Sequence, residues 1–225
     1  MSRQELLRRY LVFLLGLYVN ALGISFIIKA GLGSSPISSV PYTVSLGTPL
    51  TLGMLTFVLN FLLVIGQILL LGKDFKKEQW LQLPVTVVFS AFIDLNMHLL
   101  QPYSPNNWWL SADYFWQIVA LLVGCAILGF GVSLEVVGNV VMLGGEAFVS
   151  ALSRITKKEF GLMKVCFDTS LMLLACLISL LMFGSIEGVR EGTVIAALLV
   201  GFFARVFNRR LNGLRRWVSV EDDIP

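Results

Sequence analysis

The sequence predicts an all-α polytopic membrane protein made of two inverted repeats, each with three transmembrane helices and one short broken or re-entrant helix. The composition is 56% hydrophobic and only 14% charged, and the mean hydropathy is +0.82, values typical of a membrane protein. A shift of 108 residues places one half of the chain on the other, with Gly16, Gly23 and Ser25 on Gly124, Gly131 and Ser133. The same shift places Gly53 on Gly161 and Asn60 on Asp168. This self-similarity indicates a duplicated membrane domain.

Six apolar stretches approach the roughly 20 residues that cross a bilayer core. They are Leu11–Ile28, Met54–Leu71, Leu83–Leu100, Phe115–Val137, Leu162–Phe183 and Thr193–Phe207. These spans leave almost no room for a soluble domain. The formal net charge of +3 comes mostly from short loops, so we expect the lipid bilayer and no nucleic acid as a partner.

Lysine and arginine in the loops predict the orientation, because cytoplasmic loops carry an excess of both. Basic residues gather at the N-terminus, after the second span, before the fifth span and in the tail, whereas Gln101–Asp113 has none and carries interfacial aromatic residues. Both termini are therefore predicted to be cytoplasmic. The first repeat covers residues 1–110, the second covers 111–216, and 217–225 form a cytoplasmic tail. An odd number of spans in each repeat inverts the second relative to the first.

Two further apolar segments, Pro36–Leu46 and Leu143–Ile155, are too short to span and occupy equivalent places in the repeats. One interpretation is a pair of interfacial helices that lie flat on the membrane. The other is a pair of re-entrant helices, since short Gly/Pro-interrupted segments at matching positions indicate a transport site. Ser35 is then the expected N-cap and Pro36 the first helical residue of the first segment.

The candidate substrate-binding residues gather around these two segments. Exposed N–H groups at a helix start bind anions or carbonyl groups. Ionisable groups are costly inside a membrane and usually serve a function there, so Glu146 and Asp168 are the candidates for proton coupling. The full predicted set is Ser34, Ser35, Asn60, Gly145, Glu146 and Asp168.

A second group of polar residues is predicted to form gates or secondary sites, each with a simpler alternative. Asp94 and His98 lie four residues apart on one helical face, although His98 can simply face water. Lys164 can snorkel or form a structural bridge with Asp168. Arg190 and Glu191 belong to a loop that is either solvated or an outer gate. No catalytic triad, metal-ligand spacing or cofactor motif is visible, so we expect no enzyme, no metal and no cofactor.

With these residues in view, the chain resembles the YczE/YyaS/YitT group of bacterial integral membrane proteins, and most closely its YczE-like branch. The resemblance rests on Gly31-Leu32-Gly33-Ser34-Ser35-Pro36, Gly144-Gly145-Glu146, Asp168 and Gly188-Val189-Arg190-Glu191-Gly192-Thr193-Val194. It covers roughly residues 10–210. It implies a compact multi-pass protein of the bacterial cytoplasmic (inner) membrane.

The architecture therefore predicts a small secondary transporter or permease for a polar solute. Three alternatives stay open: a non-transporting membrane partner of another protein, the substrate-binding subunit of a multi-subunit importer, and an intramembrane enzyme. The glycine-lined spans are also compatible with a homodimer.

Overall fold

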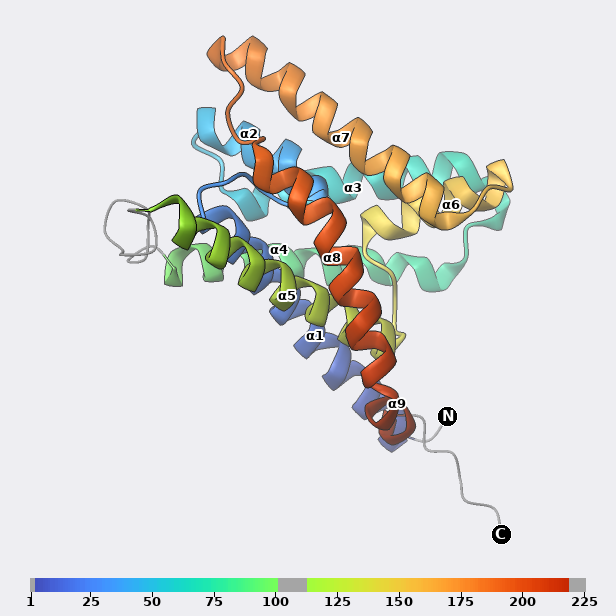
Figure 1. Ribbon diagram of the computed structural model, residues 1–225. Coiled ribbons are helices and arrows are strands. Elements are labelled where there is room, and N and C mark those ends of the chain that lie inside the picture. The colour runs from blue at the N-terminus through green and yellow to red at the C-terminus, as the bar shows by residue number, and fades with distance from the viewer. Residues whose placement is uncertain (1–2, 101–112, 219–225) are drawn as a thin grey trace.

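A computed structural model describes residues 3–100 and 113–218 (Figure 1). Within this part of the chain all regular structure is helical. The aromatic loop predicted to face outward lies outside the described residues, apart from Asp113, and so does the tail from residue 219 onward.

Six described helices are long and apolar enough to span a membrane, which confirms that part of the prediction. Their bounds are α1 Arg3–Lys29, α3 Leu52–Leu71, α4 Gln82–Leu99, α5 Tyr114–Gly138, α7 Phe160–Phe183 and α8 Glu191–Arg210. The first helix begins eight residues before the apolar stretch, because Glu5 and Arg9 continue the helix and form an ion pair of 2.9 Å one turn apart.

The two short apolar segments also form helices. In the first half, a 3₁₀ turn η1 (Pro36–Ser38) continues into α2 (Ser39–Gly47), and in the second half the segment is the single helix α6 (Gly144–Thr156). At 1.5 Å per residue, α2 and α6 extend only about 14 and 20 Å, well short of a bilayer core. The remaining elements are η2 (Gly72–Asp74), η3 (Lys77–Leu81) and α9 (Asn212–Val218).

The centre of the molecule is the contact between α1 and α5, which glycines bring together. A Cβ atom on Gly23 would meet the backbone of Leu128, and one on Gly131 would meet the backbone of Asn20. Such close approach lets two helices gain extensive van der Waals contact, which is the main attraction between helices in lipid. The repeated glycines found in the sequence therefore hold the two longest buried helices together.

Each remaining helix packs beside this central pair or crosses between the halves. Helix α4 lies along α1, and α8 lies along α5. The short helices exchange partners, because α2 packs on α7 of the second half and α6 packs on α3 of the first half. Helix α3 also packs along α4. By contrast, α7 crosses the top of Figure 1 while α8 descends away from it, and the two are in contact at very few positions.

Candidate functional site

The start of α6 is one side of the candidate site. The Gly145 N–H donates to Asn60 Oδ1 on α3 at 3.2 Å, and Asn60 Nδ2 donates to the Thr56 carbonyl at 2.9 Å. Asn60 is buried, so its amide is fixed in orientation. The predicted free N–H of Gly145 is therefore not free in this structure, because the side chain of Asn60 accepts it.

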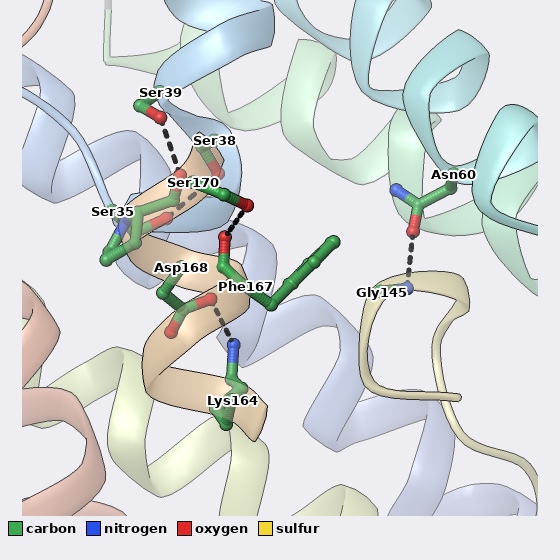
Figure 2. A network of polar contacts seen from close by, with 10 residues as sticks. Ser35, Ser38, Ser39, Asn60, Gly145, Lys164, Phe167, Asp168 and Ser170 are labelled. Carbon is green, nitrogen blue, oxygen red and sulfur yellow. Dashed lines mark hydrogen bonds and ion pairs between the residues drawn. The ribbon is translucent and has the colours of Figure 1, made fainter. Parts of the chain in front are cut away.

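The start of η1 and α2 is the other side, and it is a cluster of buried serines. Ser35 occupies the N-cap position with Pro36 as the first residue, as predicted, but its hydroxyl makes no cap. Instead the Ser35 and Ser38 hydroxyls are hydrogen bonded at 2.9 Å, and Ser39 Oγ donates to the Pro36 carbonyl at 2.6 Å. The Ser34 hydroxyl donates to the Ser35 carbonyl at 3.3 Å. Figure 2 places the cluster formed by Ser35, Ser38 and Ser39 beside the α7 segment that carries Asp168.

The two helix starts meet at Ile37 and Gly145. The end of the Ile37 side chain lies where a Cβ of residue 145 would be, so a larger residue at this position would require Ile37 to move. Shifting the sequence by 108 residues carries Ile37 onto Gly145, which means that the contact joins equivalent residues. Ile37 thus fills the space between the two starts.

The carboxylates lie along α6 and α7. Lys164 Nζ and Asp168 Oδ1 are 2.8 Å apart, which is the structural ion pair that was an alternative for Lys164 (Figure 2). Glu146 is partly buried in α6, which is not one of the six long helices. Burial raises the pKa of the Glu146 carboxyl, the Lys164 ammonium lowers it and the Asp168 carboxylate raises it, with a net rise.

A buried polar pair joins α1 and α5. Asn20 Nδ2 donates to Glu135 Oε1 at 2.7 Å, and both side chains are almost fully buried. Glu135 also interacts electrostatically with Glu146. The site therefore contains three acidic side chains, on α5, α6 and α7, and Lys164 is the cationic neighbour of the two on α6 and α7.

Two buried glutamines complete this region, and sequence reasoning missed them. The amides of Gln67 on α3 and Gln82 on α4 bond reciprocally at 3.1 and 3.2 Å, and Gln67 also donates to the Gly144 carbonyl at 3.1 Å. A signal was available, since Gln82, Thr86, Ser90 and Asp94 recur every four residues and so share one face of α4.

Gln82 also lines a cavity of about 230 Å³ between α6, η3 and the segment that precedes α6. Apolar and polar side chains both contribute to the wall. The lining residues are Leu71, Glu78, Gln79, Gln82, Val140, Val141, Met142, Ala147, Ser150, Ala151 and Arg154.

The structure separates the predicted pair on α4. Asp94 turns to the start of α3, where Oδ1 accepts from the Gly53 N–H and Oδ2 accepts from the Thr51 hydroxyl, both at 2.7 Å. His98 is exposed one turn further along. Asp94 therefore stabilises the N-terminus of α3, where a negative charge is favourable.

The loop before α8 is docked on the loop after α1. The Gly192 N–H donates to the Leu32 carbonyl at 2.9 Å, and Thr193 Oγ1 accepts from the Ser34 N–H at 3.2 Å. Arg190 extends this contact to the Gly31 carbonyl at 3.0 Å and pairs with Glu191 at 3.1 Å. The motif Gly188–Val194 thus holds together two loops that are distant in the sequence.

Among residues 3–100 and 113–218, no three His, Cys, Asp or Glu side chains gather closely enough to hold a metal ion. Comparison with curated proteins finds no match, and neither does comparison with solved structures. A family model does match, over residues 7–209, and its description is a family of unknown function, DUF6198. Because the match spans most of the chain, the protein belongs to the DUF6198 family.

Proposed function

We propose that this protein is a small secondary transporter for a polar solute, formed by two inverted repeats whose short helices are re-entrant. In this proposal it is a bacterial cytoplasmic-membrane protein, similar to the YczE/YyaS/YitT group, with both termini in the cytoplasm. It binds its solute where the repeats meet and catalyses no reaction. The proposal also places Asp94, Arg190 and Glu191 at the end of the molecule that faces outward.

The register of the elements supports the repeat. A shift of 108 residues carries Pro36, where η1 begins, onto Gly144, where α6 begins. It also carries Leu52, the first residue of α3, onto Phe160, the first residue of α7. Independent segments have no reason to begin at one constant offset, whereas duplicated ones do.

The contacts between α1 and α5 support an inversion. A Cβ on Gly16 would meet Glu135, and one on Gly124 would meet Ile27. The 108-residue shift carries Gly16 onto Gly124 and Ile27 onto Glu135, so the two contacts are the same contact seen from either repeat. A two-fold axis relates surfaces in this reciprocal way.

The observation that carries the function is the meeting of the two short helix starts at Ile37 and Gly145. Inverted-repeat transporters place their substrate site at such a junction, where half-helix ends point at the solute. Here Asn60 and the serine cluster flank the junction, and Asp168 and Glu146 lie beside it. A shift of Ile37 away from Gly145 would open a polar space between the repeats.

Glu146 is the group best suited to proton coupling. Its raised pKa brings protonation closer to physiological pH, and the charges of Lys164 and Asp168 act on this pKa in opposite directions. A solute that binds beside it would then favour one protonation state. Proton uptake and solute binding would then be coupled, because the solute binds the two protonation states of Glu146 with different affinity.

A thermal-stability screen of the purified protein tests the proposal, with a broad panel of metabolites at two pH values. A solute at 100 times its Kd stabilises the folded state by about 2.7 kcal/mol, which is readily measured. We expect at least one metabolite to raise the melting temperature, and Glu146→Gln or Asp168→Asn to abolish that rise. A complete lack of stabilisation, with both variants folding normally, would contradict transport.

A non-transporting role as a membrane partner is the second candidate. The position of Ile37 favours it, because this side chain closes the junction and leaves no room there for a solute. A partner protein would bind no metabolite in the screen and would tolerate Glu146→Gln. Co-purification from membranes would then identify what it stabilises.

A further inference from the structure

The molecule has two ends, and they differ. We call the end formed by Gly31–Ser34 and Gly188–Thr193 the latched end. The opposite end is the basic end, where the chain carries Lys73, Lys76, Lys77, Lys157 and Lys158 and where Arg154 approaches Asp74 at 3.9 Å. The start of α1 and helix α9 lie at the same end, toward the right of Figure 1.

The latched end is closed by polar contacts between the halves. Besides the bonds of Gly192, Thr193 and Arg190 to the segment 31–34, Thr43 Oγ1 donates to the Glu187 carbonyl at 3.4 Å. Gly188 packs directly on Thr43 with a positive φ of 79°. Together these contacts seal α2 and its preceding loop against the start of α8.

Equivalent residues at the basic end make none of these bonds. The counterparts of Gly192 and Thr193 are Pro84 and Val85, which have no N–H and no hydroxyl respectively. The counterparts of Leu32, Gly33 and Ser34 are Val140, Val141 and Met142, and those of Thr43 and Glu187 are Ala151 and Gln79. All five of these last residues line the cavity of about 230 Å³. A cavity at the basic end thus takes the place of the seal at the latched end.

The contact between α3 and α4 and its equivalent between α7 and α8 also differ, and again the latched end is the closed one. Near the latched end, Gly53 packs against Ser90 and Asp94, so α3 and α4 are closed together. The counterparts near the basic end are Gly161, which has no atom within 4 Å of its Cβ position, and Phe202, which is exposed. Helices α7 and α8 are therefore apart where α3 and α4 are joined.

We infer that the cavity at the basic end is a solute-binding vestibule, open to that side of the membrane only, and that its ligand is a small zwitterion. This inference rests on the proposed transport function and assigns its entry site. The cavity lies beside the candidate site, because Gln82 in its wall bonds to Gln67, which in turn bonds to the Gly144 carbonyl at the start of α6. Ala147 in its wall follows Gly145, which is at the junction of the repeats, by two residues on α6.

The wall of the vestibule defines the chemical class. Its two charged groups have opposite sign, Glu78 and Arg154, and its buried polar group is the neutral amide of Gln82. A guanidinium suits a carboxylate and a carboxylate suits an ammonium group, so together they favour a net-neutral solute with both. The apolar side chains Val140, Val141 and Ala147 suit a small side chain. A volume below the roughly 300–1,000 Å³ of drug-sized sites limits the ligand to the size of a small amino acid.

Thiol accessibility tests the one-sided opening, in a background in which Cys125, Cys166 and Cys176 are replaced by alanine. Ala147→Cys places a thiol in the vestibule, and Ser39→Cys places one at the equivalent position of the latched end. We expect a water-soluble methanethiosulfonate reagent to modify Ala147→Cys from the basic side of membrane vesicles only. Ser39→Cys should resist modification from both sides, since Ser39 is fully buried.

An unreactive Ala147→Cys would reject the vestibule, and equal reactivity of both thiols would reject its one-sidedness. If Ala147→Cys does not fold, Ser150→Cys replaces it, because Ser150 lines the same cavity and is only partly buried. A solute found in the stability screen together with an unreactive vestibule would reject this inference and leave the transport proposal standing. A reactive vestibule with no stabilising metabolite would leave only the one-sided opening standing and would reject both the bound solute and the transport proposal.

Protection of the same thiol tests the ligand class. A mixture of small α-amino acids at about ten times the Kd should slow modification of Ala147→Cys roughly tenfold. The substitution Arg154→Gln removes an exposed guanidinium and should abolish most of that protection, while Arg154→Lys should retain part of it. Modification at an unchanged rate in the presence of every amino acid would overturn the zwitterion assignment.

Discussion

At the scale of single residues, Asn60 and Asp168 explain how one position in a duplicated fold acquires two roles. They lie on the equivalent helices α3 and α7, Asn60 opposite the start of α6 and Asp168 opposite the start of η1. Asn60 accepts the N–H of Gly145, whereas Asp168 pairs with Lys164 on its own helix. An amide can satisfy a helix start permanently, because it carries no charge. A carboxylate held by a lysine can exchange that partner for a proton or a solute.

The substitution Asn60→Ala tests the first role. It leaves the buried Gly145 N–H without an acceptor, which costs about 1–3 kcal/mol of folding free energy. We expect a lower melting temperature in detergent. Thr169→Ala, on the exposed face of α7, is the matched truncation and should leave the melting temperature unchanged. Equal stability of Asn60→Ala and the parent protein would show that the hydrogen bond contributes nothing.

The substitution Glu146→Gln tests the electrostatics of α6. Since the folded protein raises the pKa of Glu146 above its usual 4.5, the folded state holds the proton more tightly than the unfolded state. Stability therefore falls as pH rises from the ordinary pKa through the raised one. We expect Glu146→Gln to be more stable than the parent at neutral pH and equal to it near pH 4. Melting curves across this range check the sign, and parallel curves for the two proteins would contradict it.

At the scale of elements, the sequence predicted the parts that depend on length and local spacing. Six spans followed from apolar length, and the start of η1 followed from Pro36, whereas α6 begins at Gly144, one residue after the predicted Leu143. The ion pair of Lys164 and Asp168 followed as an alternative from their spacing on one helix. What the sequence did not predict depends on packing between distant segments, such as the amide pair of Gln67 and Gln82 and the separation of α7 from α8. Periodicity shows that Gln82 belongs to a polar face of α4, but it does not show that Gln82 pairs with Gln67 or that α7 and α8 are apart.

The close contact of α1 and α5 gives a matched test with two glycines. A Cβ at Gly23 would enter the backbone of Leu128, whereas one at Gly201 on α8 would meet nothing within 4 Å. We expect Gly23→Ala to cost about 1–3 kcal/mol through overpacking. Gly201→Ala should instead leave stability unchanged or raise it by up to about 1 kcal/mol, because alanine favours a helix. Thermal unfolding compares the two, and equal effects would contradict the packing account.

At the scale of the whole molecule, the two halves share one architecture but differ in how their ends are held. Gly192 and Thr193 close the latched end with bonds that Pro84 and Val85 cannot make at the basic end. The sequence therefore biases the protein toward a state that is open at the basic end. Opening the other end requires that these few bonds break together.

The substitution Thr193→Val copies the residue of the other repeat and weakens the latch. It removes the acceptor of the Ser34 and Arg190 N–H groups, and valine preserves the shape of the side chain. We expect Ser39→Cys, unreactive on its own, to become reactive from the latched side in a Thr193→Val background. Folding of the variant with both Ser39→Cys and Thr193→Val is checked by size-exclusion chromatography, where it should elute as a single symmetric peak. A thiol that stays protected would mean that the latch does not govern access at this end.

The central claim is that equivalent residues of the two halves lie on opposite sides of the membrane. Leu50 precedes α3 and Lys158 precedes α7, they are 108 residues apart, and both are exposed. The direct measurement introduces Leu50→Cys or Lys158→Cys into the protein without its three native cysteines. Intact cells are then labelled with a membrane-impermeant maleimide. The account predicts that Leu50→Cys reacts at once and that Lys158→Cys reacts only after the membrane is permeabilised. Labelling of both positions from the same side would contradict the inverted repeat and the transport mechanism built on it.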